Sequence, residues 1–166
     1  MVALSFERIS AEELISLRQE ALLWVLYADR IPPHIGISQD ALFYSLKVSG
    51  KDLGVPVDQM IRLLERKKIP ALIYQLHEER SLDLKEVFAQ QEEIIAGQSS
   101  CLSPILEVLS ERKELCLIFD LLEELEAKGR INRVFGLNLP ESYQGIPDYD
   151  HESVEKRIEE IRNAQR

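Results

Sequence analysis

Cysteine is scarce in this sequence, because only Cys101 and Cys116 occur among its 166 residues. Two cysteines are too few for a disulfide framework, and these two do not form a Cys-x-x-Cys pair. The three histidines, His34, His77 and His151, stand at none of the short ligand spacings that mark a zinc site. We therefore expect neither a disulfide scaffold nor a metal, and a reducing cytoplasm is the natural setting.

Several other signatures are also missing. No apolar run approaches the roughly 18 to 20 residues that a membrane-spanning helix needs, and the first residues lack the basic and apolar regions of a secretory signal. Neither a phosphate-binding loop, nor a Gly-x-Ser-x-Gly elbow, nor a His-Glu-x-x-His zinc helix occurs. The formal charge of -9 repels nucleic acid and anionic lipid surfaces. We expect no cofactor, no nucleic-acid partner and no membrane span.

Apolar residues make up 45% of the chain and charged residues 30%, which is typical of a globular protein. The length predicts one globular domain spanning residues 1–166. The clearest β pattern lies between Pro32 and Lys51, where two alternating runs flank the polar pair Gln39-Asp40. If that pair forms a two-residue turn, the register follows. It places Ser38 opposite Ala41, Gly36 opposite Phe43, and His34 opposite Ser45.

Helical periodicity and capping residues mark most of the remaining chain. A capping box at Ser10 and Glu13 predicts a first helix that continues to Ala28 and stops before Pro32-Pro33. Further helices are predicted at 57–68, 84–97 and 111–128, after Ser100 or Ser103, and after Asp150.

Two more segments have the composition of strands, at residues 71–76 and 130–139. Together with the hairpin they predict a small antiparallel sheet built on that central hairpin and flanked by several helices. The fold class is therefore α+β.

His34, at the head of a strand, and Cys101, at or before a helix start, carry the chemistry that the residues suggest. Cysteine is nucleophilic as its thiolate, which a helix N-terminus stabilises. A nearby imidazole lowers the thiol pKa further and carries the proton. A third polar group usually orients the imidazole; Ser45 is the nearest candidate by the predicted register, and Gln75 on a neighbouring strand is a second.

The order of these residues resembles that of the circularly permuted papain-like cysteine hydrolases, which include lecithin:retinol acyltransferase and permuted relatives of the NlpC cell-wall peptidases. The resemblance covers roughly residues 32 to 108 and depends on a strand that opens His34-Ile-Gly-Ile and a later helix opened by Cys101. In that group the histidine lies on the first core strand and a polar residue on the next strand orients it. The resemblance implies a hydrolase or acyltransferase in which Cys101 attacks an amide or ester of a small molecule or peptide.

Each residue also has a structural interpretation. A histidine after two prolines is commonly a hydrogen-bonding partner of a loop carbonyl, and a lone cysteine is commonly a small buried apolar residue. Cys116 is interpreted as core. The alternative function is a non-catalytic protein-interaction domain, in which the all-round apolar segment Ala21 to Ala28 forms a homo-oligomer face on the first helix.

Overall fold

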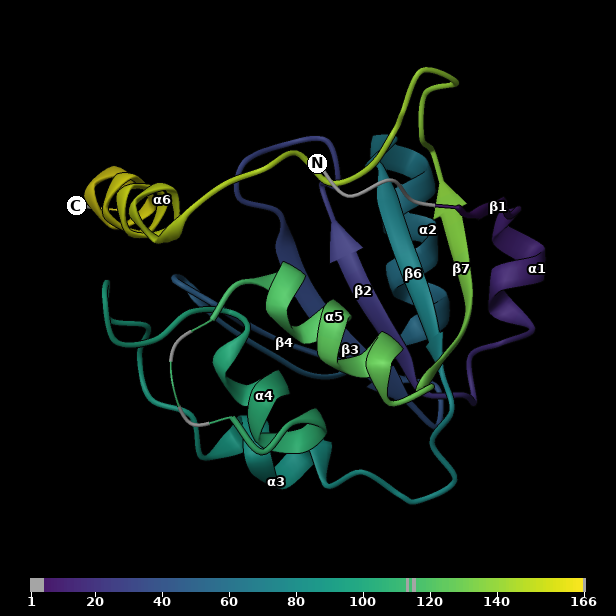
Figure 1. Ribbon diagram of the computed structural model, residues 1–166, viewed down its shortest axis with the longest axis horizontal. Helices are drawn as coiled ribbons and strands as arrows, with labels where there is room; N and C mark the ends of the chain where they lie inside the picture. Colours follow the sequence, from purple (N-terminus) through teal and green to yellow (C-terminus); the bar gives the residue numbers. More distant parts are fainter. Residues whose placement is uncertain (1–4, 113, 115, 166) are drawn as a thin grey trace.

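A seven-stranded mixed sheet organises the computed structural model, which describes residues 5–112, 114 and 116–165 (Figure 1). Its spatial order is β1-β7-β6-β2-β3-β4-β5, and all neighbours are antiparallel except the parallel pair β1 and β7. The strands are β1 (Glu7–Arg8), β2 (Leu22–Leu26), β3 (His34–Gln39), β4 (Leu42–Lys47), β5 (Gly50–Pro56), β6 (Ala71–Leu76) and β7 (Ile131–Leu137).

Helices cover both faces of this sheet. They are α1 (Ala11–Ile15), α2 (Val57–Lys67), α3 (Leu84–Ala89), α4 (Ser103–Leu109), α5 (Ile118–Ala127) and α6 (His151–Ala164). The α+β class is confirmed. No helix among the described residues is long and apolar enough to cross a membrane.

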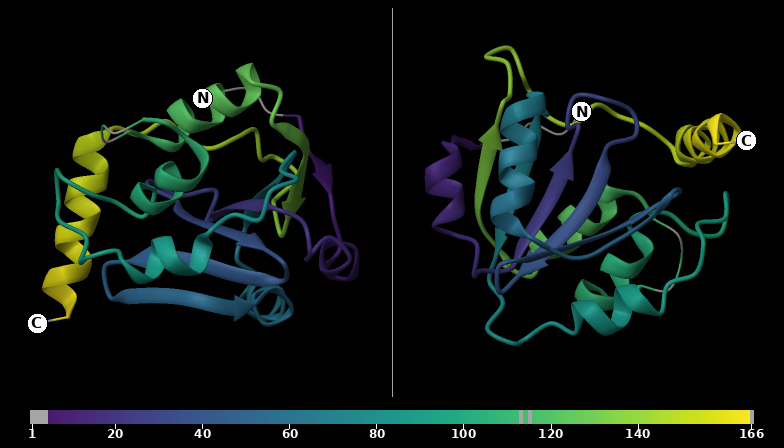
Figure 2. Two further views of the ribbon diagram at one scale, coloured as in Figure 1. Left: turned by 90° about the horizontal axis from the view of Figure 1, so that it is seen from below. Right: turned by 180° about the vertical axis from the view of Figure 1, so that it is seen from behind.

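The two faces of the sheet bury separate apolar clusters. The α2 face, covered by α1 and α2, holds Trp24, Phe43 and Ile61. The opposite face is covered by α3, α4, α5 and α6, and it holds Val25 and Ile35 together with the apolar side chains of those helices. We call it the cavity face, because a cavity described below lies on this side of the sheet. Figure 2 shows α2 alone in front of the sheet in the view from behind, while α3, α4 and α5 lie on the other side.

The predicted first helix is wrong beyond Ile15. The cap is present: Ser10 accepts a hydrogen bond from the Glu13 backbone N–H at 3.2 Å and donates to Glu13 Oε1 at 2.9 Å. The helix nevertheless ends at Ile15, and the apolar segment that follows forms β2, the middle strand of the sheet. All five β2 residues are buried, because helices cover both faces of a strand that has neighbours on both edges.

This correction also removes the predicted homo-oligomer face. Ala21 to Ala28 offers no helical surface, since its β2 residues pair with β3 on one side and β6 on the other. The hairpin, in turn, lies toward one side of the sheet and not at its centre.

The hairpin forms, but its turn lies one residue later than predicted. Asp40 and Ala41 occupy the turn with φ of 54° and 68°, the left-handed conformation of a two-residue hairpin loop. Ser38 therefore pairs with Phe43, and the register is shifted by two residues from the prediction. Because side chains alternate with a period of two, this shift keeps every residue on its predicted face.

Several other boundaries differ from the predictions. The helix expected at 84–97 ends at Ala89, and the one expected at 111–128 begins at Ile118. Residues 113 and 115 of that second segment lie outside the described residues. The strands β6 and β7 and the helix capped by Asp150 are confirmed, and the Asp150 side chain accepts from the Ser153 backbone N–H at 2.9 Å.

Candidate functional site: a cavity at the end of the sheet

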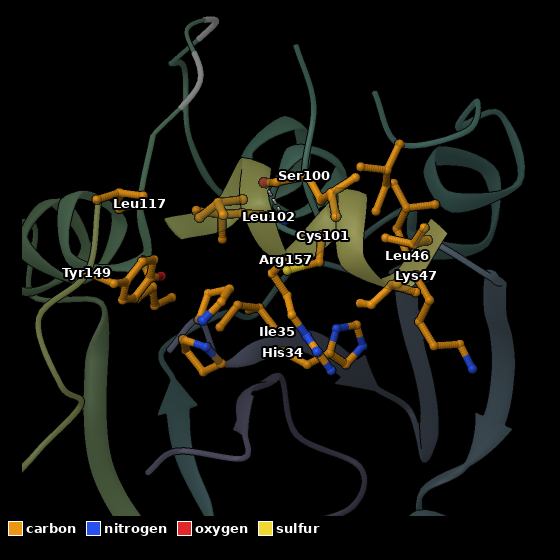
Figure 3. A pocket seen from close by; sticks show the side chains of 18 of the residues that line it. His34, Ile35, Leu46, Lys47, Ser100, Cys101, Leu102, Leu117, Tyr149 and Arg157 are labelled. Carbon is orange, nitrogen blue, oxygen red and sulfur yellow. Dashed lines mark hydrogen bonds between the residues drawn. The ribbon is translucent and has the colours of Figure 1, made fainter. Parts of the chain in front are cut away.

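A cavity of about 240 Å³ lies on the cavity face, where β3 begins and β4 ends. Its walls come from five separate parts of the chain. They are the loop before β3, the end of β4 with the turn after it, the segment before α4, the segment before α5, and the inner side of α6. Both His34 and Cys101 line it, although 66 positions separate them in the sequence. Figure 3 shows Cys101 above the strand that carries His34 and Ile35, with Arg157 reaching into the same space.

Cys101 lies in the turn just before α4 and not within the helix. The helix begins at Ser103, and Pro104 falls in its first turn. The turn is closed by two serines: Ser103 Oγ accepts from the Ser100 N–H at 2.9 Å, and Ser100 Oγ accepts from the Leu102 N–H at 3.2 Å. Both serines therefore contribute, and neither of the two predicted capping schemes is reproduced in full.

The Cys101 thiol is held in its protonated form. Burial raises its pKa above the ordinary value, and a backbone hydrogen bond with Ile35 opposes that rise. A hydrogen bond with the backbone of Cys101 itself also lowers the pKa, but burial is the larger influence, because a thiolate loses more solvation in apolar surroundings than these two bonds restore. Cys101 is therefore a neutral thiol next to a β3 backbone group, and not a preformed thiolate.

His34 is neutral for the same physical reason. Burial lowers the pKa of its imidazole from 6.5 to about 4, with opposing effects from Asp52, which raises it, and from Lys47 and Arg30, which lower it. Its Nε2 atom is buried and has no hydrogen-bond partner in the part of the chain that the structure describes. A neutral imidazole can accept a proton on one ring nitrogen, and the pKa of about 4 makes this ring a weaker base than an exposed histidine.

The sulfur and the ring do not form a hydrogen bond, and strand alternation explains why. His34 pairs with Leu26, and paired residues of antiparallel strands point to the same face. Leu26 belongs to the α2 face, whereas Cys101 packs on the cavity face, beside Ile35. His34 is the first residue of β3, so its ring lies at the end of the sheet, where the cavity opens.

The predicted orienting residues have other partners. The Ser45 hydroxyl is fully buried and donates to Asp52 Oδ2 at 2.6 Å, and Lys47 donates to Asp52 Oδ1 at 3.2 Å. Extending the observed register carries His34 toward Lys47 and Ser45 toward Gly36. Ser45 does not line the cavity, so its predicted role beside His34 has no support in the geometry.

Gln75 is no closer to this role. Its amide donates to Glu20 Oε2 at 2.6 Å and accepts from Asn132 at 3.2 Å. Asp52 is the carboxylate that influences His34, and sequence reasoning missed it because it lies on β5, a strand that was not predicted.

Several cavity residues were not predicted at all. Arg30 precedes the two prolines, Lys47 ends β4, and Arg157 and His151 lie on α6. Cys116 also lines the cavity; it is buried as predicted, but it precedes α5 and is not part of a helix. For Arg157 the only signal in the sequence is a basic residue between the apolar positions of its helix, and this signal is informative only once that side of the helix is known to line a cavity.

Comparison of the chain with models of protein families, with curated proteins and with solved structures finds no match.

Proposed function

We propose that this cavity is the active site of a cysteine hydrolase or acyltransferase, in which Cys101 is the nucleophile and His34 is the base. The observation that carries the proposal is that a thiol and a neutral imidazole with an unengaged Nε2, distant in sequence, line one cavity. The apolar walls around them suit the body of an ester or amide substrate.

The proposed reaction transfers an acyl group in two steps. His34 takes the thiol proton as Cys101 Sγ bonds to the carbonyl carbon; the ester or amide bond breaks, and the leaving oxygen or nitrogen receives that proton. Water, or a second alcohol or amine acceptor, then attacks the thioester carbonyl. The C–S bond breaks, the acid or the new acyl product is released, and the proton of the attacking group returns to Cys101 Sγ through His34. Because the thiol pKa is raised, the proton leaves during attack and not beforehand.

This mechanism requires the His34 ring to reach the sulfur when substrate is bound. Hydrogen bonds of catalytic groups are often absent in unliganded structures and form only in the complex. His34 is the first residue of β3, so its ring lies at the end of the sheet and lines the cavity that Cys101 also lines.

A test is to expose the protein to an activated ester, p-nitrophenyl acetate, and to locate the acetyl group by mass spectrometry. We expect acetyl-thioester on Cys101, its absence in Cys101→Ser, and a slowing of about 100-fold in His34→Gln, the scale of general-base catalysis. Cys116→Ser is the matched control, because it removes the other thiol that lines the cavity. Acetylation of both cysteines at equal rates, unaffected by His34→Gln, would contradict the proposal.

A second candidate is a binding cavity without catalysis. Two observations favour it. His34 Nε2 forms no hydrogen bond with Cys101, and the raised pKa of the Cys101 thiol keeps the sulfur protonated and therefore weakly nucleophilic. It predicts that a ligand binds, while Cys101→Ser changes no chemical rate.

A further inference from the structure

The charge of the cavity is opposite to the charge of the chain. Acidic residues outnumber basic ones by 29 to 20 in the whole sequence. Among the described residues that line the cavity there is no Asp or Glu, but there are three cations, Arg30, Lys47 and Arg157. Lys47 is paired with Asp52 at 3.2 Å, so Arg30 and Arg157 supply most of the uncompensated charge. Such a concentration of one sign raises the local potential and attracts the opposite charge.

Two of these cations oppose each other. The charge of Arg157 lowers the pKa of the Arg30 guanidinium, together with burial of that group, which is the larger cause. Two like charges held near each other are unfavourable unless something compensates them. Two guanidiniums are also the groups that bind carboxylate or phosphate oxygens through paired hydrogen bonds.

Local acids compensate this pair only in part. Asp29 and the Tyr27 hydroxyl act on Arg30 from its own loop, and the Arg30 guanidinium also lies over the Tyr27 ring at 3.8 Å. Glu160 contacts Arg157 at 3.7 Å between side chains that are 54% and 40% exposed, which makes this a weak ion pair. Neither Asp29 nor Glu160 lines the cavity, whereas Arg30 and Arg157 both do.

Most of the remaining wall is apolar. Ile35, Leu46, Leu102, Ile118 and Ile158 contribute aliphatic surface beyond the cations. The volume of about 240 Å³ is below the roughly 300 to 1,000 Å³ of pockets that hold drug-sized ligands. The occupant is therefore small.

We propose that the cavity binds a small amphipathic anion, an apolar chain that carries one carboxylate or phosphate group, with the anion between Arg30 and Arg157 and the chain against the aliphatic wall. This inference names the class of substrate for the proposed active site. It rests on the proposed function only in that it concerns the same cavity. It holds equally for a cavity that binds without catalysis.

The test is calorimetric titration of the full chain with four probes that share one chain length: octanoate, octyl phosphate, octanol and octylammonium. At least one of the two anions is expected to bind about tenfold or more tightly than octanol, and octylammonium more weakly than octanol, on the scale of one charge-assisted hydrogen bond. The comparison of octanoate with octyl phosphate identifies the preferred head group. Octanol binding as tightly as both anions, or no binding of any probe, would overturn the inference.

Variants locate the binding site. Arg157→Gln and Arg30→Gln are each expected to weaken anion binding about tenfold and to leave octanol binding unchanged. Lys156→Gln is the matched control, because it removes the same charge from the neighbouring, exposed residue of α6, which does not line the cavity. Equal losses in Arg157→Gln and Lys156→Gln would show that the effect is only one of net charge.

Cys101→Ser separates this inference from the catalytic proposal. The variant is expected to bind octanoate as the unaltered chain does, since the thiol does not contact the head group in the proposed arrangement. Anion binding without any acylation of Cys101 would leave the cavity as an anion-binding site and end the catalytic proposal. Acylation of Cys101 in the unaltered chain, together with binding that does not depend on the charge of the probe, would support the catalytic proposal and overturn the anion-binding inference.

Discussion

The two faces of the sheet are built differently although they share the same strands. On the α2 face, large side chains pack against one another: Trp24 and Phe43 are fully buried and meet edge to face with their ring centroids 5.8 Å apart. The Trp24 N–H donates to the buried Ser38 hydroxyl at 2.8 Å. On the cavity face, four helices from the later part of the chain cover the strands and leave a cavity at one end.

The difference teaches where variation is tolerated. A filled face loses stability when any atom is added or removed, because the neighbours have no room to adjust. A face with a cavity absorbs such changes, since its side chains already lack contacts on one side. Function is therefore expected on the cavity face and fold stability on the α2 face.

The same substitution on each face gives the largest contrast. Ile61 on α2 is fully buried, whereas Ile158 on α6 is 5% exposed and lines the cavity. Ile61→Ala is expected to lower the free energy of unfolding by about 4 kcal/mol, and Ile158→Ala by about 2 kcal/mol or less. Urea denaturation of the two variants measures both values. Equal losses would mean that the cavity face is packed as tightly as the α2 face.

His34, at the border between the faces, makes stability depend on pH. Its native pKa of about 4 lies below the value of 6.5 for an exposed imidazole, so the unfolded chain binds a proton that the folded chain excludes. The free energy of unfolding is therefore unaffected by His34 protonation above pH 6.5, and it decreases as the pH falls from 6.5 toward 4, by up to about 3 kcal/mol.

This prediction is tested by measuring the free energy of unfolding of the unaltered chain and of His34→Gln, by urea denaturation at several pH values between 7 and 4. The variant is expected to lose less stability over this window. Lys47→Gln is expected to reduce the effect as well, because Lys47 lowers the His34 pKa and also neutralises Asp52, which raises it. If the free energy of unfolding depended on pH in the same way in all three proteins, His34 would not be the group that causes the loss of stability below pH 6.5.

The same difference between the faces explains which parts of the fold were predictable from sequence. The helix α2 has one apolar side and one charged side, so its period of 3.6 was visible and its boundaries were nearly correct. The strand β2 is apolar on both faces, so its period of two was hidden, and a short apolar run of this kind does not distinguish strand from helix.

The site was predictable only in part. His34 and Cys101 were identifiable because each stands at an element boundary, and both line the cavity. The role of Ser45 depended on hairpin register, which a one-residue change of turn position altered. Arg30 and Arg157 were not identifiable, because both reach the cavity only when α6 packs against the loop before β3, and no local pattern in the sequence encodes that packing.

The smallest expected difference in stability between the two faces comes from substitutions that add one carbon atom to each of them. A Cβ on Gly36 would overlap the ring of Phe43, which is fully buried and unable to retreat, so Gly36→Ala is expected to cost about 2 kcal/mol. Val154→Ile, which extends a side chain into the cavity, is expected to change stability by about 0.5 kcal/mol or less. Because Phe43→Leu removes the ring, adding Gly36→Ala to that variant should cost almost nothing. A full loss in the double variant would mean that backbone effects, and not the Phe43 ring, require glycine at this position.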